Sequence, residues 1–374
     1  MRIAEICANP PEFVGGLERY CLEISKRLVE KGHEIEILTS EFGLKHVPDS
    51  ENMKIRRFKC LGKMWGTNPL TFIGGVLLKE QYDLVHAHSY IFFTSNQAAL
   101  FKKVKKYPFL LHLHGGVEVL PGTVSSFPIW FKREIYDRSL GKFTLYAADR
   151  IASVSKRDMA LAALRFGIPE DKFEWIPNGV DTSQFRPLTA ARRYVGFVGR
   201  LEKWKGILAF ISIARAIHRQ DKDIKFLVVG DGPLRMTAEA LAKTLPFTFT
   251  GFVPHESMPR IYSTMTVLVS PSLCEGLPTT YMEAMACGVP VVATDVGGTT
   301  EIVRPGITGF IGTDTDSFSS AILKLTHDLG TLETMRYKAF QVVRESFDIK
   351  SVVERLFETV RAIGKKDCHA QHRC

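Results

Sequence analysis

The stretch Pro271 to Glu301, PSLCEGLPTTYMEAMACGVPVVATDVGGTTE, contains the signals that decide the fold of this chain. The apolar run 267–269 precedes it, and a turn rich in proline, serine and glycine carries Glu275. A short helical segment and a β-branched run from Val289 to Thr294 complete it. A strand, a loop, a helix and a second strand in this order are typical of a parallel sheet covered by helices.

The short helix has recognisable signals at both of its ends. Thr280 to Glu283 fits a capping box, in which the threonine hydroxyl accepts from a first-turn amide and the glutamate reaches back to the cap. Gly288 is placed to end the helix in a left-handed conformation, and Pro290 prevents its continuation. The free amides at the helix start, together with the helix dipole, predict a site for a phosphate or another anion.

Two carboxylates, Glu275 and Glu283, lie on either side of this helix start. Glu275 can accept hydrogen bonds from hydroxyl groups of the molecule that carries the phosphate. The alternative is that Glu283 only caps the helix and that Glu275 is a solvated acid of the loop. The local sequence leaves both interpretations open.

With 374 residues the chain is too long for one ordinary hydrophobic core. Strands and helices alternate up to a linker near Pro187, and the pattern restarts at Tyr194. We therefore expect an α/β protein with two doubly wound Rossmann-like domains facing across a cleft. In chain order, we expect a first domain in 1–187, a second domain in 188–345, a C-terminal helix in 346–364 and a disordered tail in 365–374.

Several classes of protein are excluded. The longest largely apolar run, 66–78, is too short to span a bilayer, and the N-terminus lacks the apolar segment of a signal peptide. Seven cysteines are scattered without a disulfide framework, which indicates a cytoplasmic protein. The net charge of +9 is concentrated in clusters at 54–63 and 102–106, which suit phosphorylated acceptors or the anionic inner face of a membrane. Because no nucleic-acid-binding motif accompanies these clusters, we expect no nucleic acid partner.

The first domain has a glycine pair at the start of a helix. Gly15 and Gly16 follow the expected strand 2–7. Glycine lets the backbone approach a phosphate closely there, although many such glycines only form the turn.

Three histidines follow strands of the same domain. His86 and His88 end the strand that begins at Asp83, and His114 follows the strand 109–112. Ligands bind outside the carboxyl ends of the strands in an open parallel sheet. The histidines are therefore site candidates, and the alternative for each is a structural role.

The second domain repeats this arrangement, with polar or glycine residues after each expected strand. Arg200 and Lys205 follow the strand 194–198, Gly230 follows the strand 225–229, and Phe252 and Val253 follow the strand 247–250.

Other segments are open to more than one interpretation. Residues 127–146 form either a helix that buries its aromatic side chains or a surface helix that touches lipid headgroups through its basic face. The acid pairs at 221–223 and 314–316 are interpreted as a loop and as the start of the helix 317–329, and no metal site is expected there. The cysteines and histidines of 368–374 belong to the expected disordered tail.

Together, these residues resemble the retaining glycosyltransferases of family 4, which have the GT-B fold. The resemblance runs over most of the chain, and its most specific part is the pair Glu275 and Glu283, separated by seven residues. The other matching segments are the Gly15–Gly16 loop with Glu18, 83–88, His114-Gly115, 176–181, 199–206, 229–233 and 251–252.

The resemblance implies a role for each candidate. Arg200 and Lys205 resemble the cations that hold the donor diphosphate. Glu275 resembles the carboxylate that accepts hydrogen bonds from the sugar hydroxyls, and Glu283 resembles the one that accepts them from the ribose hydroxyls. His114 resembles the family histidine near the reacting centre, so the implied catalytic set is His114, Glu275, Arg200 and Lys205. The remaining residues implied in donor binding are Gly15, Gly16, Gly230, Phe252, Val253, Gly276, Leu277, Pro278, Thr279 and Thr280.

The implied activity is transfer of a hexose, with retention, from a UDP-, GDP- or ADP-sugar to a sugar or lipid-linked acceptor. The product would be a cell-surface glycan or glycolipid. In the family the donor phosphate accepts the acceptor's proton during front-face attack, so no cofactor or metal is expected, and the last helix returns to the first domain. A phosphorylase, a nucleotide-sugar epimerase and an inactive nucleotide-sugar-binding protein remain alternatives on the same fold, and the sequence predicts no oligomeric state.

Overall fold

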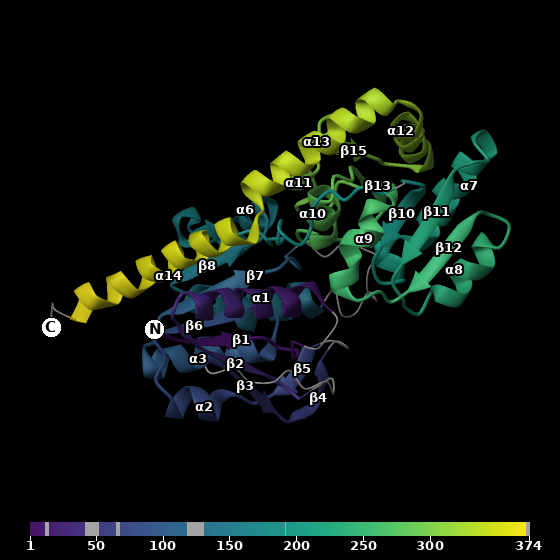
Figure 1. Cartoon of the computed structure of the whole chain (residues 1–374). Helices are drawn as coiled ribbons and strands as arrows, with labels where there is room; N and C mark the ends of the chain where they lie inside the picture. Colours follow the sequence, from purple (N-terminus) through teal and green to yellow (C-terminus); the bar gives the residue numbers. More distant parts are fainter. Residues whose placement is uncertain (12–14, 42–51, 65–67, 118–130, 191, 372–374) are drawn as a thin grey trace. The chain divides into compact units, whose positions relative to one another are not determined.

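The computed structural model of the chain describes residues 1–11, 15–41, 52–64, 68–117, 131–190 and 192–371 (Figure 1). The chain divides into two compact units. One comprises Met1–Pro177 with Val352–Cys374, and the other comprises Asn178–Ser351. Residues 178–187, which the sequence analysis placed in the first domain, therefore group with the second unit.

A parallel sheet of seven strands, in the order β3-β2-β1-β6-β7-β8-β9, forms the centre of the first unit. Its strands are β1 (Arg2–Ile6), β2 (Glu34–Ser40), β3 (Met53–Phe58), β6 (Leu84–His88), β7 (Phe109–Leu113), β8 (Arg150–Ser153) and β9 (Phe173–Trp175). All neighbouring pairs are parallel, so the carboxyl ends of the strands meet at one edge. A separate antiparallel hairpin joins β4 (Cys60–Met64) to β5 (Asn68–Thr71).

Amphipathic helices complete the first unit. In α1 (Gly16–Glu30), the buried residues Tyr20, Cys21, Ile24 and Leu28 recur at helical spacing, and they pack the helix on the sheet. The other helices are α2 (Gly74–Lys79), α3 (Phe93–Lys105), a π-helix (Lys132–Gly141), α5 (Lys142–Ala147), α6 (Lys156–Phe166), a 3₁₀ turn (Glu170–Lys172) and α14 (Ile349–Gln371).

The second unit repeats the plan with a parallel sheet of six strands, in the order β12-β11-β10-β13-β14-β15. Its strands are β10 (Tyr194–Val198), β11 (Lys225–Val229), β12 (Phe247–Gly251), β13 (Met265–Ser270), β14 (Val291–Ala293) and β15 (Gly309–Ile311). Its helices are α7 (Ile207–Gln220), α8 (Arg235–Ala242), α9 (Met258–Ser263), α10 (Thr279–Ala286), α11 (Thr299–Ile302), α12 (Thr315–His327) and α13 (Leu329–Ser346), with 3₁₀ turns at Lys203–Lys205 and His255–Ser257.

The structure decides several of the predictions made for individual segments. Helix α14 continues to Gln371, into the segment 365–374 that was expected to be a disordered tail, and 372–374 lie outside the described residues. Asp314 caps α12 as predicted, since its side chain accepts from the Ser317 amide. Of the stretch 127–146, residues 127–130 lie outside the described part, and the remainder is helical, with Tyr136 and Leu145 buried in the core.

Within the described part of the chain, no helix combines the length and the apolar character needed to cross a bilayer.

Candidate active site

The loop that carries Glu275 packs backbone to backbone against two other segments of the second unit, beside the predicted anion site. Gly206, with φ of 78°, is so close to Pro271 that a β-carbon added to it would lie 2.0 Å from the Pro271 carbonyl oxygen. Gly297, with φ of 52°, has the same relation to the carbonyl oxygen of Glu275, again at 2.0 Å. Only glycine fits at either position, so the loop that carries Glu275 is in direct contact with the turn after Lys205 and with the segment at Gly297.

Lys205 and Glu275 form an ion pair between these loops. The Lys205 ammonium donates to both carboxylate oxygens of Glu275, at 2.7 and 2.9 Å. The Lys205 Nζ also lies 4.4 Å from the centre of the Trp204 ring, a cation–π contact. Since 19% of the Lys205 side chain and 7% of the Glu275 side chain are exposed, the pair is partly shielded from water. The structure thus brings together two of the residues predicted for the catalytic set.

Glu283 does not form the predicted capping box. Helix α10 begins after Pro278 without a side-chain cap, and Glu283 instead points inward, where only 5% of it is exposed. Its Oε1 lies 2.9 Å from His255 Nε2, and its Oε2 accepts from the Tyr262 hydroxyl at 2.8 Å. The prediction failed because these two partners come from α9 and the turn before it, which the local sequence could not show. Gly288, with φ of 67°, does end the helix in the predicted left-handed conformation.

The remaining predicted residues of the second unit surround this centre. Arg200 lies on the surface and pairs with Glu202 at 2.5 Å, and Phe252 is 61% exposed. The Gly276 carbonyl accepts from the Gly298 amide at 2.7 Å, and the Leu277 carbonyl accepts from the Asn178 side chain at 2.6 Å. Gly230 has φ of 123°, Pro278 is buried, and Val253, Thr279 and Thr280 are half-buried.

The sequence analysis assigned no role to Asn178, Trp204, His255 or Tyr262. Asn178 lies in the matched segment 176–181, and its side chain donates to the Leu277 carbonyl.

In the first unit, Gly15 and Gly16 begin α1 as predicted. A β-carbon at Gly15 would lie 2.0 Å from Oε2 of Glu18. Glu18 is 5% exposed and accepts from the Asn9 side chain at 2.9 Å. The glycine therefore leaves room for a carboxylate beside the helix start.

A cluster of histidines lies on one face of the sheet in the first unit. The register pairs Glu5 of β1 with His86 of β6, and His88 of β6 with His112 of β7. Because side chains alternate along a strand, these residues point to the same face. His114 lies just beyond β7, with its Nε2 2.9 Å from His88 Nδ1. The sequence analysis selected three of the histidines but missed Glu5 and His112.

Glu5 anchors this cluster. Its Oε1 lies 3.0 Å from His86 Nδ1, and its Oε2 lies 3.0 Å from His88 Nε2. Burial raises the pKa of Glu5, but His86 and His88 lower it more, to about 2. Burial lowers the pKa of His88, but Cys21 and Glu5 raise it more, to about 10. We therefore expect Glu5 to stay ionised beside the imidazoles that contact it.

The ring nitrogens of the cluster lie close enough to raise the question of a metal ion. Those of His86, His88 and His112 lie within 4.8 Å of one another. Each is already within hydrogen-bonding distance of Glu5, of another histidine or of the Ile176 carbonyl. The arrangement is accounted for by hydrogen bonds, and we assign no metal to it.

Comparisons with known proteins agree with this architecture. Residues 14–184 match the model of Glycosyltransferase Family 4, and residues 192–328 match that of the Glycosyl transferases group 1. A D-inositol 3-phosphate glycosyltransferase from Kribbella flavida is 30% identical over 364 residues, which cover 86% of this chain and 84% of that protein. The chain belongs to glycosyltransferase family 4.

Two solved structures show that this family 4 glycosyltransferase has the GT-B fold. The chain is similar to a sucrose-phosphate synthase from Thermosynechococcus elongatus, with 23% identity, a TM-score of 0.80, and coverage of 97% of this chain and 98% of that one. It is also similar to Anabaena HepE, solved in complex with UDP-glucose, with 19% identity, a TM-score of 0.77, and coverage of 97% and 100%.

Proposed function

We propose that this glycosyltransferase moves a hexose from a nucleoside diphosphate sugar to a hydroxyl acceptor with retention of configuration. The observation that carries the proposal is the Lys205–Glu275 pair beside the uncapped start of α10. A cation and free helix amides suit a diphosphate, and a carboxylate suits sugar hydroxyls. When a diphosphate takes over Lys205, Glu275 becomes free to accept from those hydroxyls.

In the proposed reaction the acceptor oxygen bonds to the anomeric carbon, and the bond from that carbon to the phosphate oxygen breaks. The electron pair leaves with the nucleoside diphosphate, and the acceptor's proton passes to a phosphate oxygen. Lys205 and Arg200 offset the negative charge that develops on the leaving group. Glu283, held by His255 and Tyr262, is assigned to the ribose hydroxyls. Phe252, which is largely exposed, and Val253 are assigned to the base.

The donor is the first property to test. Because the similar HepE was solved with UDP-glucose, UDP-sugars head a panel that also contains GDP- and ADP-sugars. Thermal shift identifies the nucleotide, and NMR of the product gives the anomeric configuration. An inverted product would contradict the proposal. Dependence on inorganic phosphate would indicate a phosphorylase, and sugar interconversion without an acceptor would indicate an epimerase.

The roles of the ion pair are tested by single substitutions. Lys205→Ala and Glu275→Ala are each expected to lower turnover roughly 10²-fold or more, since each removes a group that stabilises developing charge or orients the sugar. Lys203→Ala and Glu256→Ala are matched controls, because both side chains are exposed and lie in neighbouring turns. Wild-type turnover in either site variant would show that the assigned roles are wrong.

We also propose that the acceptor is lipid-linked and that the first unit docks on the anionic, cytoplasmic face of a membrane. On α3, Leu100, Lys103 and Val104 are exposed at positions i, i+3 and i+4, so they form one stripe. Leu78 and Lys79 are exposed on α2, which packs against α3.

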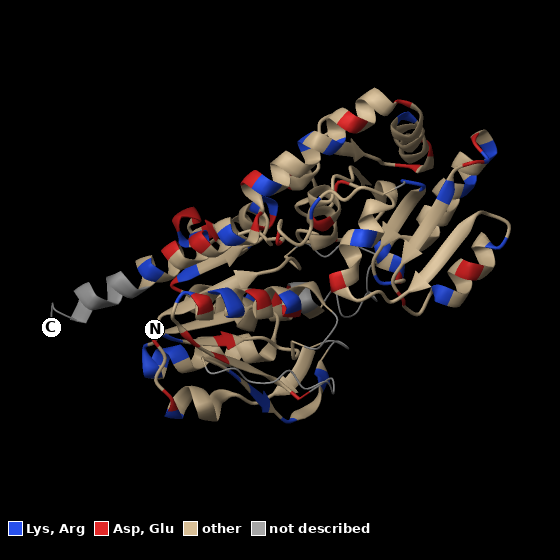
Figure 2. Ribbon diagram, in the orientation of Figure 1, with Lys and Arg blue, Asp and Glu red and all other residues tan. Residues whose placement is uncertain are grey.

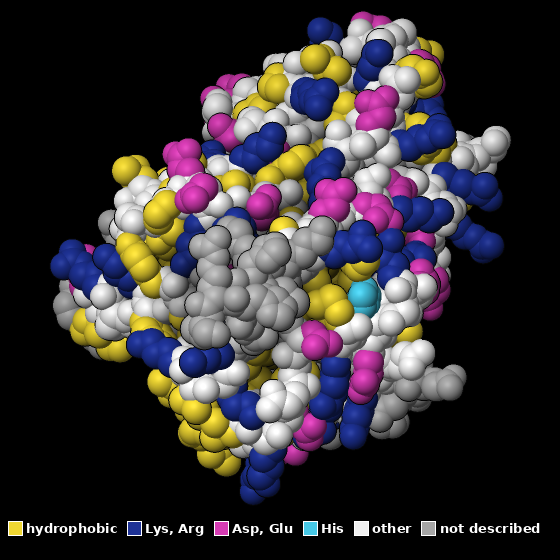
Figure 3. Space-filling view, turned by 90° about the vertical axis from the view of Figure 1, so that its left-hand side faces the viewer, with side chains coloured by type: hydrophobic (Ala, Val, Ile, Leu, Met, Phe, Trp, Pro, Cys, Tyr) yellow, Lys and Arg dark blue, Asp and Glu magenta, His cyan; other side chains and the backbone are white. Residues whose placement is uncertain are grey.

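The figures support the pairing of charge and apolar surface in this region. Figure 2 shows basic residues on α2 and at the end of α3. Figure 3 looks at the side that carries these helices, and hydrophobic side chains lie beside lysine and arginine in its lower part. Side chains of both kinds together are typical of proteins that bind anionic lipid surfaces.

Membrane docking is tested by sedimentation with vesicles. Leu100→Glu combined with Val104→Glu is expected to lower binding to vesicles of phosphatidylglycerol and phosphatidylcholine at least tenfold. Leu164→Glu, on the exposed side of α6, is the matched control. Equal binding to vesicles of pure phosphatidylcholine would contradict the role of the lysines.

A further inference from the structure

The loop between β10 and α7 carries both cations that are assigned to the diphosphate, and neighbouring segments hold its backbone. The Leu201 amide donates to the Asp231 carbonyl at 2.9 Å. Further along the loop, the Trp204 carbonyl accepts from the Leu273 amide at 2.8 Å. Because these bonds fix the path of the loop, a ligand that binds the two cations reorganises their side chains rather than the backbone.

Glu202 lies between the two cations in the sequence and contacts the first of them. Its Oε1 lies 2.5 Å from Nη2 of Arg200. Its Oε2 accepts from the indole N–H of Trp204, so each carboxylate oxygen has a partner. The Glu202 side chain is 20% exposed, whereas the Arg200 side chain is 53% exposed. The carboxylate is thus the more firmly held member of the pair, and the guanidinium is accessible to a ligand.

Both cations have a carboxylate partner in the structure. Arg200 pairs with Glu202, and Lys205 pairs with Glu275. Trp204 connects the two pairs, since its indole donates to Glu202 and the centre of its ring lies 4.4 Å from the Lys205 ammonium. A diphosphate that binds both cations must therefore compete with both carboxylates.

The two carboxylates differ in what they can do once they release their cations. Glu275 is assigned to hydroxyls of the sugar, so its release serves the bound donor. Glu202 has no such assignment, and its second oxygen is already held by Trp204. If Glu202 kept its bond to Arg200, it would share one guanidinium with a phosphate, and two anions at such short range repel each other. Glu202 therefore opposes the diphosphate.

We propose that Glu202 is an affinity-determining residue that competes with the donor diphosphate for the guanidinium of Arg200. This inference rests on the proposed function, because it takes Arg200 as a ligand of the diphosphate. The competition weakens the binding of the donor and of the nucleoside diphosphate product alike. Weaker binding of the product favours its release at the end of each reaction cycle.

The first test measures the affinity for a diphosphate in Glu202→Gln. The substitution keeps the size of the side chain and an oxygen that can accept from Trp204, but it removes the charge. The dissociation constants of UDP and of inorganic pyrophosphate are expected to fall roughly threefold to fivefold at low ionic strength, since a partly exposed ion pair contributes a factor of this size. Calorimetric titration measures both constants. Substitution of a merely structural residue would weaken binding or leave it unchanged, and either result would overturn the inference.

A second glutamate–arginine pair provides the matched control. Glu333 pairs with Arg336 on α13, a helix that carries none of the residues assigned to the donor, and its side chain is 62% exposed. Glu333→Gln removes the same charge as Glu202→Gln and is expected to leave both dissociation constants unchanged. Equal tightening in the two variants would show that net charge alone explains the effect, and the inference would fail.

The second test asks whether Glu202 acts through Arg200. Arg200→Gln removes the guanidinium for which the carboxylate competes. In that background, Glu202→Gln should change the dissociation constant of pyrophosphate by less than about 1.5-fold, because the two substitutions are then coupled. Tightening as large as in the wild-type background would contradict the inference, since Glu202 would then repel the ligand without competing for Arg200.

Pyrophosphate separates a failure of the inference from a failure of the proposed function, because it carries neither a base nor a sugar. If the wild type binds pyrophosphate but transfers no sugar, the proposed function fails and the titrations of the variants still decide the inference. If the wild type transfers sugar and Glu202→Gln does not tighten binding, only the inference fails. If the wild type binds neither pyrophosphate nor UDP, both fail.

Discussion

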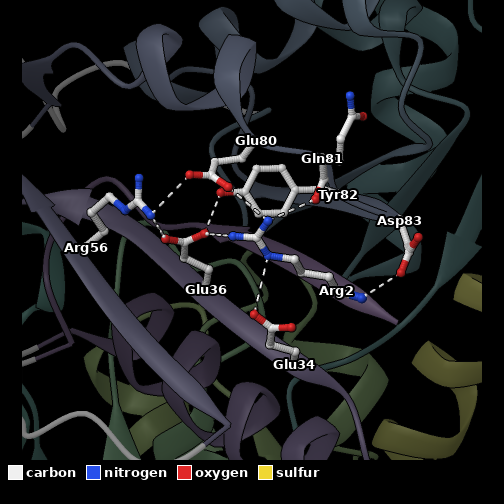
Figure 4. Close-up of polar contacts among 8 residues, drawn as sticks. All are labelled: Arg2, Glu34, Glu36, Arg56, Glu80, Gln81, Tyr82 and Asp83. Atoms are coloured by element: carbon white, nitrogen blue, oxygen red, sulfur yellow. Dashed lines mark hydrogen bonds and ion pairs between the residues drawn. The ribbon is translucent and has the colours of Figure 1, made fainter.

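The two ends of the seven-stranded sheet hold buried polar clusters that balance their charges differently. At the amino ends, Arg2 lies 3.2 Å from the buried Glu36 and 3.0 Å from Glu80 (Figure 4). Arg56 also pairs with Glu36, at 2.5 Å, and the Tyr82 hydroxyl donates to Glu36 at 2.6 Å. At the carboxyl ends, the imidazoles of His86 and His88 contact a second buried carboxylate, that of Glu5.

The difference lies in how permanent the positive charges are. Guanidinium groups stay charged at any pH that the fold survives, so the arginine cluster around Glu36 has a fixed charge balance. Imidazoles gain and lose protons within the physiological range, so the balance around Glu5 depends on a proton. The first cluster is suited to holding three neighbouring strands together, and the charge balance of the second can change with pH.

The largest effect is expected when the carboxylate of the arginine cluster is removed. Glu36→Ala leaves two guanidinium groups facing a buried gap, and it should lower the free energy of unfolding by about 3 kcal/mol. Urea denaturation measures this loss. Glu34→Ala is the control, because that side chain is 65% exposed, and its salt bridge should contribute less than about 1 kcal/mol. Similar losses in the two variants would contradict the special role of the buried carboxylate.

A smaller effect should appear as a pH dependence that belongs to the histidine cluster alone. The pKa of His88 in the folded state is raised to about 10, although burial opposes this, because Cys21 and Glu5 favour the proton. The stabilisation is therefore complete below about pH 6.5 and is lost as the pH rises through the folded-state value. Between pH 7 and 9 the contribution of His88 alone should fall by up to about 1.4 kcal/mol for each pH unit, and Cys21, whose pKa is lowered to about 7, opposes this fall because its ionisation favours the fold as the pH rises.

This slope is measured by urea denaturation at several pH values. In Glu5→Gln the slope should change, because one of the two groups that raise the pKa of His88 is removed while Cys21 stays. In Glu36→Ala the slope should equal that of the wild type, because arginine does not titrate in this range. An unchanged slope in Glu5→Gln would show that Glu5 does not help to hold a proton on His88.

The smallest effect is expected at Tyr82. Tyr82→Phe removes the hydroxyl that donates to Glu36 but keeps the ring, whose centre lies 5.0 Å from the Arg2 guanidinium carbon. The loss of one hydrogen bond in a cluster that keeps its charges should lower the free energy of unfolding by about 1 kcal/mol. Calorimetry on the wild type and the variant checks this value, and a loss above about 3 kcal/mol would mean that the hydroxyl organises the whole cluster.

Most of the architecture could be predicted from the sequence because it depends on local patterns. Apolar runs followed by glycine or proline located the sheet strands around 2–7, 194–198, 225–229 and 247–250, and the motif order indicated the family. The strand Met53–Phe58 was missed, because its lysines and arginines were interpreted only as a basic surface cluster. Arg56 in fact pairs with a glutamate on the neighbouring strand, a contact that no local pattern contains.

The site was predicted where a motif carries it and missed where only tertiary contacts do. Lys205 and Glu275 were both selected, and the structure shows them in contact. Glu283 was also selected, but its partners His255 and Tyr262 were not, since nothing near α10 in sequence points to them. Glu5 could have been suspected, because a carboxylate within the apolar strand Arg2–Ile6 must find a buried partner.

The close contact of Gly206 and Gly297 with carbonyl oxygens has a thermodynamic consequence for ligand binding. Loops that already touch through their backbones have little freedom left to lose, so a ligand that binds beside them pays little conformational entropy for ordering them. The same contacts leave no space for a side chain at either glycine. In this chain the ligand preference must then depend on the surrounding side chains, such as the exposed Phe252, and not on movement of these loops.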